Sequence, residues 1–503
     1  METRVTMTDG ERTDRSQSPV SFVPTPSAQY RRHRKASALM LEPGAPRVAL
    51  GAETDPVIFG LGTRVLMWKQ DPSVSEIGTR KVFLPGLVLS GPRDARIMFG
   101  APGIDPVSPN AFGDFVTTPD TPQFDAVHTY AVVRQTLTMY QRALAGSHDT
   151  PLPWQWNSTA DLAPLHIFPH GLPNVMNAFY SRSQGCLKFG DFIPTGQSER
   201  VFTCRSFDIV AHETGHAVLD GLKPDWLLAN NPPQTGGLHE AFGDLTAIFL
   251  SLSQLDQCEA VIAQTKARLH DKTFLADIAE QFGLALGRSN GLRNADNDIT
   301  MSQAGDQVHA ISQVFTGAIY DILADLFALA RDPAQLDDAA VLHRVGDYLR
   351  GLVLRALIAA PDHAATYADV VNAMLRIAWE DEQPIALLNA IRNRFTLREV
   401  VLAEGSLDED YVPGVHLAPA VQDLPGAIQD RRACCGTMNL AEYYNVEHLL
   451  EQELQKLSEW CAQHGRTGNV VEVSGAPHEP QGDLPFMPDF DSQHEPKLIK
   501  ARP

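Results

Sequence analysis

The sequence predicts an α+β protein with a β-rich N-terminal lobe and a helical C-terminal lobe. Short segments rich in β-branched and aromatic residues, bounded by glycine, proline and aspartate, occupy residues from about 45 to 115 and predict a twisted antiparallel β region. From Asp125 the apolar residues follow the three-and-four spacing of amphipathic helices, and the same spacing recurs over residues 339–400. With 503 residues and 44% hydrophobic content, the chain can bury a core large enough for two or three domains.

We expect four segments along the chain. Residues 1–44 are polar and form a disordered N-terminal arm, and residues 45–205 form the β-rich lobe. Residues 206–402 contain the helices with the candidate site and the rest of the helical lobe. Residues 403–503 form a C-terminal extension of unknown role, which begins with an acidic, turn-rich linker.

The charge balance and the cysteine content limit the classes of partner and compartment. The chain has 41 lysine and arginine residues against 61 aspartate and glutamate residues, which disfavours nucleic acid and anionic membranes as partners. No apolar run is long enough to span a bilayer, and the N-terminus lacks the apolar core of a signal peptide. We therefore predict a cytoplasmic protein, with leaderless export as the alternative. The six cysteines do not form a disulfide pattern, so we expect mostly free thiols.

The most informative stretch is an H-E-x-x-H pattern at residues 212–216. Ser206 can cap the start of a helix that contains this pattern. On that helix His212 and His216 share one face, so the two imidazoles can hold one metal ion. Glu213 projects beside them, where its carboxylate could take a proton from a water molecule at the metal.

A second predicted helix supplies further donors. Catalytic zinc takes three protein ligands and keeps a fourth position open. After Gly236-Gly237, the segment LHEAFGDLTAIF places Glu240 and Asp244 one turn apart on the same face. Glu240 can complete a His/His/Glu ligand set, and Asp244 can accept the outer N–H of a ligand histidine. The alternative is an accidental motif on a core helix, but the two helices together favour a site for one zinc ion per chain.

The segments DIVAHETGHAVLDG and GGLHEAFGD resemble the thermolysin family of zinc metallopeptidases, which belongs to the gluzincins. The resemblance covers residues from about 115 to 400 and is most specific between 206 and 250. It implies a thermolysin-like two-lobed fold with zinc in the cleft between the β-rich and helical lobes.

The resemblance also implies roles for the motif residues. His212, His216 and Glu240 would bind zinc, and Glu213 would act as the general base. The sequence departs from the family pattern between His216 and Glu240, where the gap is longer. The loop in this gap also lacks the tyrosine that family members carry there.

The predicted strand pair within residues 175–191 matches the family's substrate-binding edge strand. Asn177 and Ala178 occupy the matching positions, so the resemblance implies that they contact the peptide substrate. An extended peptide can add to such an edge through main-chain hydrogen bonds. The alternative is an interior hairpin. We interpret the neighbouring His166 and His170, and also His128, as structural residues.

Two loops after the metal helices carry further residues with implied roles. Arg293, with Arg288 as its rival, matches a loop arginine that binds the substrate carbonyl. His309 matches a histidine that stabilises the tetrahedral intermediate, a role suited to an imidazole N–H near developing negative charge. Asp306 is close enough in sequence to orient His309.

Calcium is not expected. The resemblance implies a calcium ligand four residues before the first zinc histidine, and Asp208 matches it. Ser251 stands where a second ligand, a glutamate, would be. The nearby Asp256 and Glu259 are too few for the six to eight oxygens that calcium takes.

The sequence therefore predicts a zinc-dependent endopeptidase that hydrolyses peptide or protein substrates. One alternative is a gluzincin aminopeptidase, and another is a catalytically impaired zinc-fold protein that binds a partner. Glu213 and His309 argue against lost catalysis, whereas the missing loop tyrosine argues weakly for it. Nothing in the sequence indicates the oligomeric state.

Overall fold

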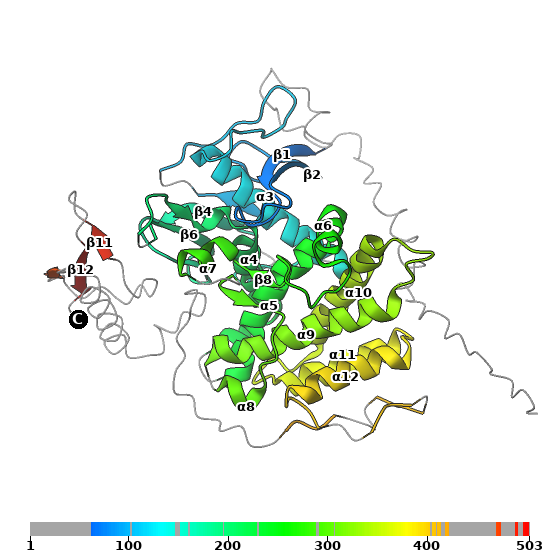
Figure 1. Cartoon of the computed structure of the whole chain (residues 1–503). Coiled ribbons are helices and arrows are strands. Elements are labelled where there is room, and N and C mark those ends of the chain that lie inside the picture. Colours follow the sequence, from blue (N-terminus) through cyan, green and yellow to red (C-terminus); the bar gives the residue numbers. More distant parts are fainter. Residues whose placement is uncertain are drawn as a thin grey trace, which may run out of the picture.

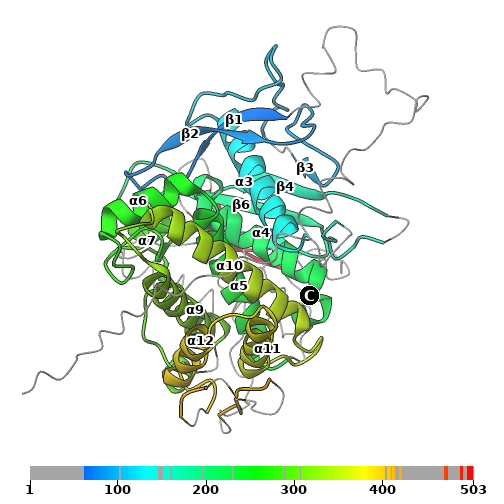
Figure 2. The same cartoon turned by 90° about the vertical axis from the view of Figure 1, so that its right-hand side faces the viewer.

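The computed structural model describes residues 62–421, except 101–102, 146–150, 159–160, 195, 229–230, 288–290, 306, 403–404, 409 and 414–417, and the backbone of strands β10 (Asn469–Val473), β11 (Pro488–Phe490) and β12 (Pro496–Ala501). The predictions for residues 1–44 and for most of 403–503 lie outside these residues, as do Asp306 and Arg288. The strands of residues 63–202 lie toward one end, and helices α11 (Tyr367–Glu380) and α12 (Ile385–Leu397) lie at the other, with α4 (Phe207–Leu222) and α5 (Pro233–Leu252) between them (Figures 1 and 2).

Two groups of strands form the N-terminal part. The first is an antiparallel pair, β1 (Thr63–Trp68) and β2 (Thr79–Leu84). The second is a five-stranded sheet of order β3-β4-β6-β5, in which β7 also pairs with β6. Its strands are β3 (Ile97–Phe99), β4 (Leu165–Leu172), β5 (Ala178–Ser181), β6 (Cys186–Phe192) and β7 (Val201–Phe202).

The prediction that the β region before residue 115 is wholly antiparallel is wrong for β3. This strand pairs in parallel with β4, which in turn pairs in parallel with β6. Parallel neighbours need a long crossover, and the connection from β3 to β4 supplies one because it contains the helix α3 (Pro122–Ala143). The predicted strand pair β5 and β6 is antiparallel.

Helix α3 connects the sheet to the helices of the candidate site. Its N-cap Thr121 accepts a hydrogen bond from Phe124 N, and the helix packs against β1, β4 and α4 (Figure 2). The Tyr140 hydroxyl lies 2.7 Å from Thr246 Oγ1 on α5. A fully buried side chain therefore joins the strand-rich part to the second helix of the site.

Helix α4 (Phe207–Leu222) starts as predicted, with Ser206 Oγ accepting from Ile209 N at 3.4 Å. The prediction that the next helix begins after Gly237 is wrong, because α5 runs from Pro233 to Leu252. Proline suits the first position of a helix, where no N–H is needed. Gly237 lies inside the helix because the Tyr367 hydroxyl packs against it. Any larger residue would place a Cβ that collides with this hydroxyl.

The C-terminal part is helical, as the apolar spacing predicts for residues 339–400. Its helices are α9 (Val308–Ala330), α10 (Asp338–Ala359), α11 (Tyr367–Glu380) and α12 (Ile385–Leu397). Among the described helices, α9 alone is long and apolar enough to cross a membrane by length and composition. Most of α9 is buried against protein, so this is weak support for a membrane span.

The segment between α5 and α9 contains short elements. They are α6 (Leu255–Thr265), α7 (Glu280–Ala285) and α8 (Met301–Ala304), with two-residue strands β8 (Asp277–Ile278) and β9 (Arg293–Asn294). The strands pair in antiparallel register, which the sequence did not predict. The three described cysteines, Cys186, Cys204 and Cys258, are buried free thiols.

Candidate metal centre

The two histidines of α4 and Glu240 of α5 converge in the protein interior. Each side chain is at most 3% exposed, and their donor atoms lie within 4.8 Å of one another. The two Nε2 atoms of His212 and His216 are 2.9 Å apart, and a Glu240 oxygen lies 3.7 Å from each. A tetrahedral zinc ion with bonds of about 2.1 Å separates its ligands by about 3.4 Å. The donor types and their spacing therefore fit zinc.

Two glycines allow α4 and α5 to approach closely enough for this convergence. A Cβ at Gly243 would lie 2.6 Å from the ring of His212. A Cβ at Gly215 would lie 2.5 Å from Thr246 Oγ1. The helix crossing is thus set by small residues beside the candidate ligands.

Asp244 lies against the outer nitrogen of His212. Its Oδ1 is 2.9 Å from Nδ1, which orients the imidazole so that Nε2 faces the other candidate ligands. Arg293 in turn donates to Asp244 from Nε at 2.9 Å and from Nη2 at 2.6 Å. Burial raises the pKa of Asp244, but the charge of Arg293 and the hydrogen bond with His212 outweigh it and hold this pKa below its usual range.

His239 lies against the outer nitrogen of His216, a contact that the sequence analysis did not predict. The two Nδ1 atoms are 2.7 Å apart, and His239 is fully buried. Burial lowers the pKa of His239 to about 3, so its ring is neutral and can accept a hydrogen bond from His216 Nδ1–H. No spacing pattern marks His239 in the sequence, because only the crossing of α4 and α5 brings it to His216.

The candidate ligands themselves have shifted pKa values. Burial lowers the pKa of His216 well below its usual value. Burial also lowers the pKa of His212, but Asp244 outweighs this and raises it overall. Burial raises the pKa of Glu240, whereas the charges of His309 and His216 outweigh it and hold this pKa well below its usual range. Glu240 is therefore ionised, as a metal ligand must be.

A cleft beside the candidate ligands brings together residues that the sequence placed at the site. Its lining includes Asn177, Ala178, His212, Glu213 and Arg293. The rest of the lining is mainly apolar and consists of Thr203, Ile209, Ile278, Ala279, Phe282 and Leu292. The residues predicted to contact substrate thus share one cleft with the predicted general base.

The carboxylate of Glu213 is held by the edge strand. Its Oε2 accepts a hydrogen bond from the backbone N–H of Tyr180 at 3.0 Å. Tyr180 belongs to β5, which is the terminal strand of the five-stranded sheet among the described residues. This contact could not be predicted from the sequence, because a backbone donor leaves no residue pattern.

Arg293 and His309 have partners that the sequence analysis did not predict. Arg293 lines the cleft, but its guanidinium also forms the ion pair with Asp244. His309 lies in the first turn of α9, with Nε2 3.2 Å from Glu240 Oε2, and is not among the residues lining the cleft.

Asp208, the residue matched to a calcium ligand, is fully buried. Its Oδ2 accepts from the backbone N–H of Ala279 at 3.2 Å. Burial and the neighbouring charge of Asp71 raise the pKa of Asp208 well above its usual value, and Glu280 adds to the shift. Ser251, at the second position, has its hydroxyl oxygen 3.1 Å from the donor Gln70 Nε2.

Comparison with models of known protein families finds no match to this chain, and no curated protein has a significantly similar sequence. The family resemblance therefore depends on the quoted motifs alone.

Proposed function

We propose that this protein is a zinc-dependent endopeptidase with a thermolysin-like two-lobed architecture. One observation carries the proposal. The donor atoms of His212, His216 and Glu240 converge beside a cleft that Glu213 and the edge-strand residues also line. A metal site, a proton acceptor and a peptide-binding edge are the parts that metal-assisted peptide hydrolysis needs.

The proposed chemistry divides between the metal and the side chains around it. A zinc ion bound here would polarise the scissile carbonyl and lower the pKa of a water molecule. Glu213 takes the proton of the attacking water and delivers it to the leaving amine. The Tyr180 N–H keeps Glu213 Oε2 in place during both transfers. The resemblance assigns to His309, whose Nε2 lies 3.2 Å from Glu240 Oε2, the stabilisation of the negative charge that develops on the carbonyl oxygen.

The cleft favours an endopeptidase over the aminopeptidase alternative. A substrate segment can extend β5 through main-chain hydrogen bonds, with Asn177 and Ala178 at the start of that edge. The apolar lining around Phe282 suits an apolar side chain of the substrate. An aminopeptidase needs an acidic group for the free amine, but Glu213 is the only carboxylate among the described residues that line this cleft.

A peptide library with cut positions read by mass spectrometry tests the proposal. We expect internal cuts by the wild type, and a loss of turnover of at least about 10²-fold in Glu213→Gln, because general-base catalysis contributes about 10² to 10⁴. Elemental analysis is the control. Glu213→Gln should keep its zinc, whereas His216→Ala should lose it.

Three results would contradict the proposal. Removal of single N-terminal residues would identify the aminopeptidase, and bound zinc without any cleavage would identify the impaired binding protein. Near-normal turnover by Glu213→Gln would remove Glu213 from the role of base.

A further inference from the structure

A second group of metal-binding side chains lies apart from the candidate metal centre. Asp125 of α3, His170 of β4 and Cys204 of the short 3₁₀ helix Thr203–Arg205 place their donor atoms within 4.8 Å of one another. We infer that this Cys204 cluster binds a divalent transition-metal ion of the zinc class, in addition to the single zinc ion predicted from the sequence.

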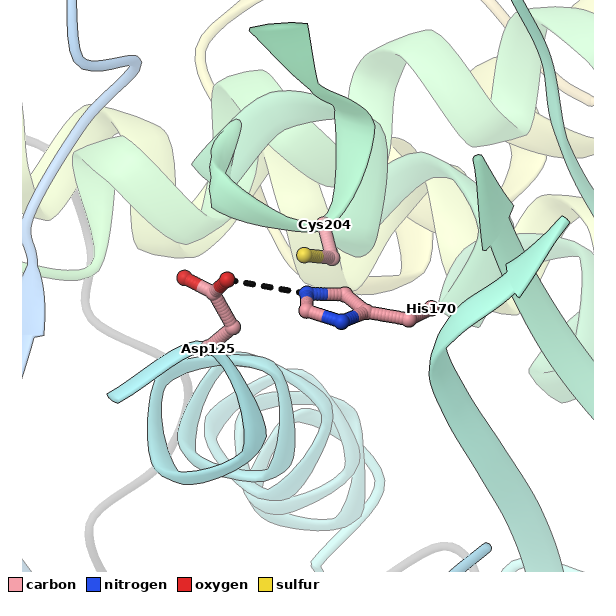
Figure 3. Close-up of side chains that lie close together, drawn as sticks. All are labelled: Asp125, His170 and Cys204. Carbon is pink, nitrogen blue, oxygen red and sulfur yellow. Dashed lines mark hydrogen bonds and ion pairs between the residues drawn. The ribbon is translucent and has the colours of Figure 1, made fainter. Parts of the chain in front are cut away.

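The side chains of the Cys204 cluster point toward one another from three different elements (Figure 3). Asp125 Oδ2 is 2.9 Å from His170 Nε2, and the Cys204 sulfur lies beside both (Figure 3). Thiolate, imidazole and carboxylate are the three ligand types that zinc takes in proteins. Asp125 and Cys204 are fully buried, whereas the side chain of His170 is 18% exposed, so an ion can enter from the His170 side.

Arg205 orients the carboxylate and completes the charge balance. Its Nε donates to Asp125 Oδ1 at 2.7 Å and its Nη2 to Oδ2 at 3.1 Å, and its Nη1 lies 3.0 Å from Asp120. Carboxylates that bind metals are commonly held by such a donor. When an ion binds, the thiol of Cys204 releases its proton to solvent, and the two positive charges of the ion are balanced by the thiolate and Asp125. The charge of Arg205 is then met by Asp120.

His128 lies on the same helix as Asp125, but its ring nitrogens are not among the donor atoms that converge within 4.8 Å. It follows Asp125 by one turn on the same helix and is fully buried. Neither of its ring nitrogens has a hydrogen-bond partner of normal geometry. Burial lowers its pKa to about 4, so the ring is neutral and carries an available lone pair. From the sequence, both His128 and His170 are interpreted as structural residues, His128 because its helix offers no second metal ligand.

The location of the Cys204 cluster indicates a structural metal. Cys204 lies two residues before Ser206, the N-cap of α4. A bound ion would join α3 and β4 to the segment that starts the helix of His212 and His216. This inference does not depend on peptidase activity.

Cobalt substitution of the full chain tests the inference. Metal-free protein is titrated with Co²⁺, and the near-ultraviolet charge-transfer band between sulfur and cobalt is followed. His212, His216 and Glu240 contain no thiol, so they cannot produce this band. We expect two bound equivalents with the band in the wild type, and one equivalent without the band in Cys204→Ser.

Matched variants make the result decisive. Cys258→Ser removes another buried free thiol, on α6, and should keep both equivalents and the band. His216→Ala should lose one equivalent and keep the band, which separates this inference from the proposed peptidase site. If Cys204→Ser does not fold, His170→Gln, at a partly exposed position, should abolish or shift the band. A wild type without the band, or a band that survives in folded Cys204→Ser or unchanged in His170→Gln, would overturn the inference.

Discussion

At the scale of single residues, the candidate metal centre depends on what holds the outer nitrogen of each histidine. His212 is held by Asp244, and His216 is held by His239. The two arrangements differ in charge, because Asp244 is paired with Arg293 whereas burial keeps His239 neutral. His239 therefore orients His216 without adding a negative charge to the interior.

Replacement of His239 tests this positioning role. His239→Leu leaves the Nδ1–H of His216 without its acceptor, so we expect zinc affinity to fall by about 10- to 100-fold. His239→Asn keeps an acceptor of similar reach and should stay close to the wild type. Competition with a zinc-binding dye measures both. Equal affinity in the wild type and in folded His239→Leu would show that His239 only fills space.

At the scale of elements, two short elements between the long helices position charged residues in the protein interior. The β8–β9 pair places Arg293 against Asp244. Helix α7 begins at Glu280, close to the charges of Asp71 and Asp277. Burial and these neighbouring carboxylates raise the pKa of Glu280 to about 7. The start of α7 is thus sensitive to pH near neutrality.

Glu280→Gln should make the protein more stable above pH 7. Because the folded pKa of Glu280 is about 7 and the ordinary value is 4.5, this group favours folding below pH 4.5. That contribution is lost as the pH rises through 7. The variant cannot ionise, so its melting temperature should exceed that of the wild type at pH 8 and match it at pH 4.5.

A pH series of thermal melts measures this difference, with Glu259→Gln at an exposed position of α6 as the control. The control should follow the wild type at every pH. A gap between Glu280→Gln and the wild type that does not change between pH 4.5 and 8 would contradict the role of Glu280 ionisation.

At the scale of the whole molecule, the fold brings distant segments together around the start of α4. Asp71 follows β1 and lies near Asp208 of α4, while Gln70 reaches Ser251 of α5. These contacts satisfy the two positions that the resemblance assigns to calcium binding. Burial and the charge of Asp71 raise the pKa of Asp208 well above its usual value, which disfavours the ionised carboxylate that a cation would need as a ligand.

We therefore expect calcium removal to leave the protein unchanged. A calcium-selective chelator, added to zinc-loaded protein, should not alter the melting temperature or the rate of peptide cleavage. The matched control is a zinc chelator, which should lower both. A fall in melting temperature that calcium reverses and zinc does not would show that the fold holds calcium in spite of Ser251.

The sequence by itself determined the candidate ligands and the helices that carry them. His212, His216, Glu240 and Asp244 were found because helical periodicity is local, so spacing along the chain predicts which side chains share a face. The helical nature of residues 339–400 followed from the same periodicity. The start of α5 was misplaced because Gly236 and Gly237 normally break a helix, whereas here Gly237 allows contact with Tyr367.

Only the tertiary structure decided the contacts between segments that are far apart in sequence. The hydrogen bond from Tyr180 N–H to Glu213, the pairing of His239 with His216, and the Cys204 cluster all require a particular packing of helices and strands. Such contacts follow no periodicity, because they depend on crossing angles and close approach rather than on spacing along one element. The candidate ligands could therefore be predicted from the sequence, whereas the groups that hold and surround them could not.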